Sequence, residues 1–89
     1  MMRDARLSAH ARSAMARRQV SEAAVRSVLA APQAVMPDER AGRLVYQGFA
    51  LVGAPSFTAL LRVVVDEGPP PEVVTVYPTT QFRRYGATR

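Results

Sequence analysis

The chain has 89 residues, enough for one small domain, and its hydrophobic fraction of 48% is typical of a folded protein. The absence of cysteine excludes disulfides and thiolate metal sites, and a single histidine with seven acidic residues leads us to expect no bound metal or cofactor. No apolar run approaches the ~20 residues of a membrane span, and the first residues lack the apolar stretch of a signal peptide. We therefore expect a cytoplasmic protein without a membrane partner.

All twelve basic residues are arginines, and the formal net charge is +5. Residues 1–26 hold six arginines and two acidic residues, residues 27–72 hold three and five, and residues 73–89 hold three arginines and no acid. If the two basic ends meet in space, they form one positive surface suited to phosphate groups. RNA is the partner that this pattern favours. The alternative is that the arginines reflect coding bias and solubility.

The first third of the chain predicts two short helices. Ser8 is a suitable N-cap for a helix that ends at Arg18, and Ser21 is a suitable N-cap for a second helix that ends before Pro32. The buried side of the first helix is expected to consist of Leu7, Ala11, Ala14, Met15 and Arg18. The second helix is expected to bury Val25, Val28 and Leu29.

After Pro32 the hydrophobic period changes from 3.6 to 2, which predicts strands. The expected strands are 34–39 at an edge, 43–49, 59–66 and 72–77, the last ending at Pro78. Short connections favour an antiparallel meander. The predicted fold is α+β, with two N-terminal helices packed on a three- to four-stranded antiparallel sheet. We expect a single domain over residues 1–89, with a core of about 7–80 and a basic C-terminal tail of 79–89.

One motif suggests a family. The spacing His-x-x-x-Arg-Met-x-x-Arg-x-(Ile/Val)-Ser is matched at His10, Met15, Arg18, Val20 and Ser21. Residues 72–78, which read Glu-Val-Val-Thr-Val-Tyr-Pro, look like a closing strand. Over about residues 7–80 the chain thus resembles a small bacterial family known as domain of unknown function 4258. That family is grouped by analogy with RelE-like and BrnT-like toxins, whose fold is shared with metal-independent ribonucleases such as barnase.

The resemblance implies a RelE/barnase-like fold and a toxin-like, metal-independent endoribonuclease of a bacterial toxin–antitoxin system. Its partners would be RNA and a small acidic antitoxin protein. The chain departs from the motif at Ala14, where the family has arginine. If that arginine binds the scissile phosphate, Arg17 one turn later or Arg62 on a strand are the candidates to replace it. Otherwise the departure favours the alternative, a non-catalytic RNA- or protein-binding module on the same fold.

Metal-independent RNA cleavage needs a proton acceptor for the 2′-OH and a proton donor for the leaving 5′-oxygen. The only histidine fills one role, and Tyr77 is a candidate for the other. The pKa of a tyrosine is ordinarily about 10, and we expect adjacent guanidinium groups to lower it. The predicted catalytic residues are His10, Arg17, Arg18 and Tyr77. The predicted substrate-binding residues are Arg62, Thr75, Arg83 and Arg84.

Each of these residues has a structural alternative. The histidine can serve as a helix residue that bonds a neighbouring carbonyl, and the arginines can form a solvated surface. Thr75 and Tyr77 can form a cross-strand packing pair. Arg18 is set among apolar residues, which predicts a buried stem and a specific acceptor, with Asp66 as the candidate.

Overall fold

Both helices begin at a serine whose hydroxyl caps the first turn. The computed structural model describes residues 2–88. Ser8 caps α1 (Ala9–Arg18) and Ser21 caps α2 (Glu22–Ala30), each accepting a hydrogen bond from the backbone N–H three residues later. Between the helices Gln19 adopts a left-handed conformation (φ 55°), which turns the chain into the second helix. The two predicted helices and their caps are confirmed.

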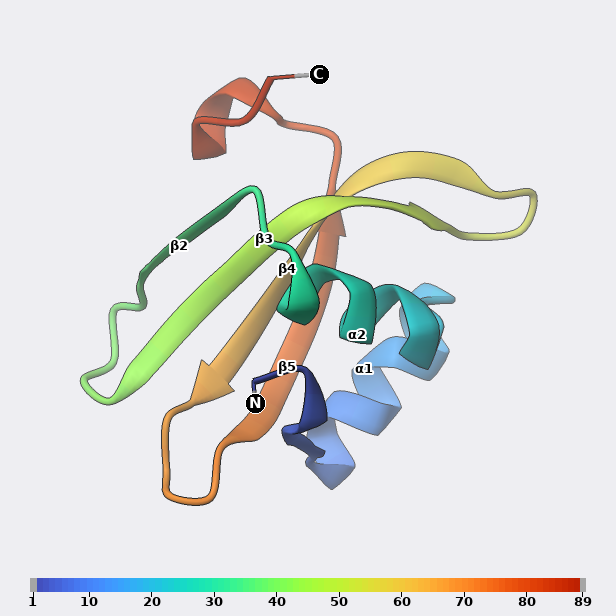
Figure 1. Cartoon of the computed structure of the whole chain (residues 1–89). Coiled ribbons are helices and arrows are strands. Elements are labelled where there is room, and N and C mark those ends of the chain that lie inside the picture. Colours follow the sequence, from blue (N-terminus) through green and yellow to red (C-terminus); the bar gives the residue numbers. More distant parts are fainter. Residues whose placement is uncertain (1, 89) are drawn as a thin grey trace.

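Five strands form one sheet in the order β1-β5-β4-β3-β2 (Figure 1). Their bounds are β1 (Arg6–Leu7), β2 (Ala34–Pro37), β3 (Arg43–Val52), β4 (Phe57–Asp66) and β5 (Glu72–Thr79). Two 3₁₀ turns, η1 (Met2–Asp4) and η2 (Arg83–Tyr85), lie near the ends of the chain. Strands β2 to β5 pair antiparallel in chain order, with β2 at an edge as predicted. The α+β class with two N-terminal helices is therefore confirmed.

The prediction of a purely antiparallel sheet of three or four strands is wrong at one edge. The short strand β1 runs parallel to the start of β5, with Arg6 opposite Glu72 and Leu7 opposite Val73. Two residues carry no periodic pattern, so no sequence signal marks this strand. Strand β5 also continues through Pro78, which we expected to end it. Because β1 pairs only with the start of β5, Pro78 lies on a free edge, where the missing N–H costs no ladder bond.

The helices cover one face of the sheet (Figure 1). This face carries alternate residues of β4, and a bulge in β5 opposite Val64 and Val65 brings Val73 and Val76 to the same face. The core between sheet and helices contains Leu61, Val63, Val65, Val73 and Val76. α1 contributes Ala11 and Ala14, whose exposed fractions are 0% and 1%, so that this helix lies close to the strands. Neither helix of residues 2–88 is long and apolar enough to cross a membrane.

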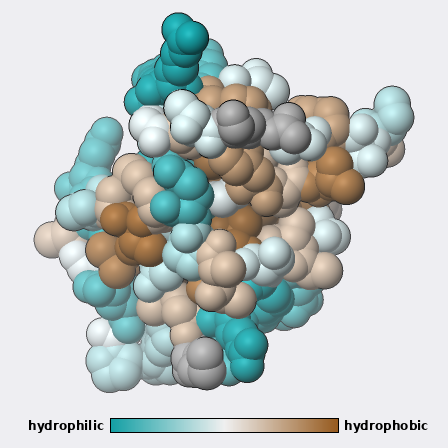
Figure 2. All heavy atoms as spheres, turned by 45° about the horizontal axis from the view of Figure 1, so that its top comes forward, coloured by the Kyte–Doolittle hydropathy of each residue, from teal (hydrophilic) through white to brown (hydrophobic). Residues whose placement is uncertain are grey.

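The other face of the sheet, called here the second face, carries the intervening residues. The pairing register places Ala34, Gln47, Arg62 and Tyr77 in one row across β2, β3, β4 and β5. Residues 80–88, called here the C-terminal segment, turn back and pack on this face. Figure 2 shows hydrophobic areas that are interrupted by hydrophilic side chains on the side of the molecule it presents.

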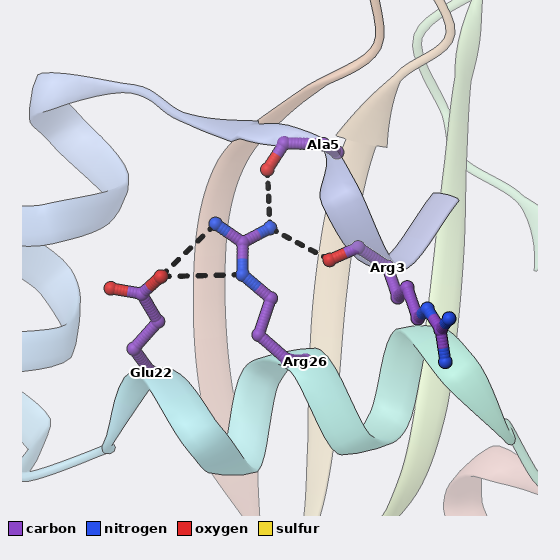
Figure 3. A network of polar contacts seen from close by, with 4 residues as sticks. All are labelled: Arg3, Ala5, Glu22 and Arg26. Carbon is purple, nitrogen blue, oxygen red and sulfur yellow. Dashed lines mark hydrogen bonds and ion pairs between the residues drawn. The ribbon is translucent and has the colours of Figure 1, made fainter. Parts of the chain in front are cut away.

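The N-terminal segment is fastened to α2 by Arg26 (Figure 3). Its guanidinium donates hydrogen bonds to the carbonyls of Arg3 (2.9 Å) and Ala5, and it forms an ion pair with Glu22 at 3.2 Å. These bonds satisfy backbone carbonyls that precede β1. They hold the chain in the position from which it enters β1 and then α1.

Candidate functional site

A pocket of about 610 Å³ reaches across the second face from the start of α1 to the turn between β2 and β3. Its lining residues come from three parts of the fold: Ser8, His10, Asp38, Arg40, Arg43, Val64, Val74, Thr75 and Tyr77. Its lining includes two arginines and one aspartate, so basic groups predominate. The pocket therefore combines a titratable imidazole, a phenol and guanidinium groups.

The position of His10 follows from the way α1 is attached to the sheet. The Ser8 hydroxyl caps the helix and also donates a hydrogen bond to the Val74 carbonyl (3.3 Å), while the Ser8 N–H donates to the Val73 carbonyl (3.0 Å). The start of α1 is thus fixed against β5. His10, in the first turn, is exposed and shares the pocket with Thr75 and Tyr77. The structure brings these three predicted residues together.

Tyr77 is joined to Arg62, whose guanidinium donates a hydrogen bond to the phenol oxygen. Burial raises the pKa of Tyr77 above its ordinary value, and this effect outweighs the opposing influence of Arg62. The expectation that guanidinium groups would lower this pKa is therefore wrong in its net direction. At neutral pH the phenol is protonated, so Tyr77 is able to donate a proton but not to accept one.

Arg62 is a buried cation, with only 7% of its surface exposed. Its Nε donates to the Gln47 Oε1 (3.1 Å), and its guanidinium carbon lies 4.0 Å from the centre of the Tyr85 ring. A further guanidinium nitrogen donates to the sulfur of Met36 at 3.2 Å. Within residues 2–88 no carboxylate forms an ion pair with Arg62; the pairs present are Arg6–Glu72 and Arg26–Glu22. A buried guanidinium held only by neutral groups is unusual, because buried charges are normally paired.

Arg17 and Arg18 do not line the pocket. They lie in the last turn of α1, about 10 Å along the helix axis from His10. The prediction of a buried stem for Arg18 is wrong, since its side chain is exposed. Val20 takes the apolar position instead: its N–H bonds the Met15 carbonyl (2.9 Å) and only 5% of its surface is exposed. The expected acceptor, Asp66, bonds the N–H of Gly68 (3.0 Å).

Arg83 and Arg84 lie in η2 and are exposed. Arg84 donates a hydrogen bond to Gln81 (3.2 Å) and lies over the ring of Tyr85, 5.6 Å from its centre. These arginines belong to the segment on the second face, whereas α1 packs on the opposite face. Arg83 and Arg84 therefore belong to an element on the opposite side of the sheet from α1, which carries Arg17 and Arg18.

Three residues of this region escaped sequence reasoning: Arg40, Arg43 and Gln47. The two arginines lie in the part of the chain where acidic residues predominate, so the charge pattern does not mark them as a phosphate site. Strand alternation is the signal that could identify Arg43 and Gln47, because Arg43, Val45 and Gln47 are alternate residues of β3 and point to the same face. Ala14 does not mark the loss of a phosphate-binding arginine from this pocket. Its side chain lies in the core, so an arginine at this position would not point into the pocket.

Within the described residues no cluster of three or more histidine and acidic side chains is placed to hold a metal ion. No protein-family model, no curated protein and no solved structure matches this chain. The function is accordingly inferred from the chemistry of the pocket.

The raised pKa of Tyr77 predicts how stability depends on alkaline pH. A group whose pKa is raised by folding contributes stability that is complete below its unfolded pKa, about 10, and is lost as pH rises through the folded value. We expect the melting temperature to fall more steeply above pH 10 for the wild type than for Tyr77→Phe. Thermal melts followed by circular dichroism between pH 8 and 12 measure this difference, and parallel curves would contradict it.

Proposed function

We propose that this protein is a toxin-like, metal-independent endoribonuclease that binds and cleaves RNA in the pocket on the second face. His10 accepts the proton of a ribose 2′-OH, and the freed oxygen attacks the adjacent phosphorus. The bond from phosphorus to the 5′-oxygen breaks, and Tyr77 donates its proton to that leaving oxygen. The products are a 2′,3′-cyclic phosphate and a 5′-hydroxyl, so atoms and charges balance without a metal or a cofactor.

The observation that carries this proposal is the presence of His10 and Tyr77 in the same pocket. The imidazole of His10 is the proton acceptor and the protonated phenol of Tyr77 is the proton donor, which are the two roles that the reaction needs. Arg62 supports the second role. Its guanidinium contacts the phenol oxygen and favours the negative charge that develops on that oxygen as the proton leaves.

Binding of the RNA backbone is assigned to Arg40 and Arg43, which line the same pocket. Guanidinium groups bind phosphate oxygens at two points, and the chain as a whole carries a charge of +5. Thr75 adds a hydroxyl from β5. In a toxin–antitoxin pair the partner would be a small acidic protein that covers this basic pocket and inhibits cleavage.

The test is incubation of the purified protein with RNA in excess EDTA, followed by analysis of the product ends. We expect cleavage that persists in the chelator and leaves 2′,3′-cyclic phosphate and 5′-hydroxyl termini. Affinity for RNA should fall as salt rises, because phosphate contacts release counterions. Loss of cleavage in EDTA, or 5′-phosphate products, would contradict the mechanism.

A second candidate is RNA binding without cleavage. It is favoured by the raised pKa of Tyr77, since acid catalysis is most efficient when the pKa of the donor lies near the working pH. The same assay separates the two functions. Salt-sensitive binding with intact RNA would support the binding module and reject the nuclease.

A further inference from the structure

The C-terminal segment forms a self-contained turn on the second face. Its backbone hydrogen bonds are internal: Tyr85 and Ala87 donate to the Phe82 carbonyl (3.1 and 2.9 Å), and Gly86 donates to the Arg83 carbonyl (3.1 Å). The segment adds no strand to the sheet. It is therefore able to leave the second face as a unit without breaking a ladder bond.

Side chains dock this turn. The ring of Phe82 meets that of Phe49 edge to face, with centres 5.2 Å apart, and Ala87 is fully buried. Gln47 donates a hydrogen bond to the Tyr85 carbonyl (2.9 Å). The Tyr85 ring lies on the guanidinium of Arg62 at 4.0 Å. The docking thus covers the one buried cation of residues 2–88 that lacks a carboxylate partner.

This cover touches the proposed RNA site. Arg62 contacts the phenol oxygen of Tyr77, and Tyr77 lines the pocket, so Arg62 lies directly behind the pocket wall. Stacking on an aromatic ring does not use the in-plane N–H groups of a guanidinium. Of the five N–H groups of Arg62, three donate to Gln47, Tyr77 and Met36, and the other two are the donors for phosphate oxygens. When the segment leaves, Arg62 joins the pocket as a further cation.

We propose that the C-terminal segment is an internal competitor of RNA, which covers Arg62 until a backbone phosphate of the RNA displaces it. This inference rests on the proposed function for the identity of the ligand. The segment itself carries Arg83 and Arg84 and no acid, so it repels Arg62 electrostatically while its aromatic ring attracts it. A phosphate bound to Arg62 offsets its charge and so weakens the cation–π attraction that holds the Tyr85 ring.

The test compares the binding of a fluorescein-labelled RNA oligonucleotide, and separately of inorganic phosphate, to full-length variants. Tyr85→Ala weakens the cover, and we expect it to bind both probes about three- to tenfold more tightly than the wild type. Tyr85→Phe keeps the ring and should bind as the wild type does. The gain should disappear in the double variant Arg62→Met/Tyr85→Ala.

A second measurement follows the segment itself. Adding RNA to the wild type should speed hydrogen exchange at the amides of Tyr85, Gly86 and Ala87, because RNA displaces the turn. Should Arg62→Met fail to fold, Arg62→Lys takes its place, since lysine lacks the planar fork. Unchanged or weaker binding by Tyr85→Ala, or a gain that persists without Arg62, would overturn the inference.

The outcomes also separate this inference from the proposed function. If Tyr85→Ala binds RNA more tightly in a way that depends on Arg62, and the wild type does not cleave RNA, the nuclease is rejected and the covering role of the C-terminal segment is retained. Cleavage by the wild type with no gain in Tyr85→Ala would keep the nuclease and reject the cover. If Tyr85→Ala binds inorganic phosphate more tightly but binds RNA no more tightly than the wild type, Arg62 remains a covered anion site and RNA is rejected as its ligand.

Discussion

Replacing His10 with alanine is expected to lower the rate of RNA cleavage by roughly 10²–10⁴-fold, the usual contribution of a positioned acid or base. His10 is the only histidine, and no other group of the pocket has an ordinary pKa near neutrality. The side chain is exposed in the first turn of α1, so its loss should leave the fold intact. Single-turnover cleavage in EDTA measures the rate.

Two further variants make this result specific. Ser13→Ala changes another exposed position of α1 outside the pocket, and it should cleave at the wild-type rate. Tyr77→Phe removes the proton donor while it keeps the ring, and it should also lose most of the activity. Equal cleavage by the wild type and His10→Ala would remove the histidine from the mechanism.

The second large effect concerns stability, and it is expected for Gln47→Leu. Gln47 is fully buried and connects three parts of the fold: it accepts from Arg62 and donates to Gln33 (2.8 Å) and to the Tyr85 carbonyl. Leucine fills a similar volume but leaves Arg62 and the Tyr85 carbonyl without this partner. A buried group that loses its partner costs about 1–3 kcal/mol, and more when it is charged. We expect a total loss of about 3 kcal/mol in the free energy of unfolding.

Urea denaturation measures this loss, and Gln33→Leu is the matched control. Gln33 is exposed and meets Gln47 at the edge of the network, so its replacement should cost less than about 1 kcal/mol. Equal effects of the two substitutions would show that the network does not stabilise the fold.

The sequence predicts much of the fold because its signals are local. Ser8 and Ser21 mark the helix starts, and the change of period after Pro32 marks the sheet, as the structure confirms. The strand Arg6–Leu7 is not predictable in this way, since its partner is far along the chain. A strand of two residues is too short to show a hydrophobic period, and its pairing depends on residues far along the chain.

The candidate site is predicted less completely. Side-chain chemistry alone marks His10, Thr75 and Tyr77 as candidates, and the structure places them in one pocket. Helical periodicity predicts that Arg18 lies on the buried side of its helix, but the chain turns at the left-handed Gln19 and Val20 is buried there instead. The sequence alone does not show which face of the sheet the helices cover, and that choice decides where Arg62 lies.

The pairing of β1 with β5 also determines when the pocket can form during synthesis. The hydrogen bond from Ser8 to Val74 spans 66 positions of the chain, so His10 cannot be fixed against Tyr77 until the last strand has been made. Contacts of such long range form late, after the local helices and hairpins. A chain still on the ribosome therefore lacks the assembled pocket until residues 72–79 have been made and are free to pair.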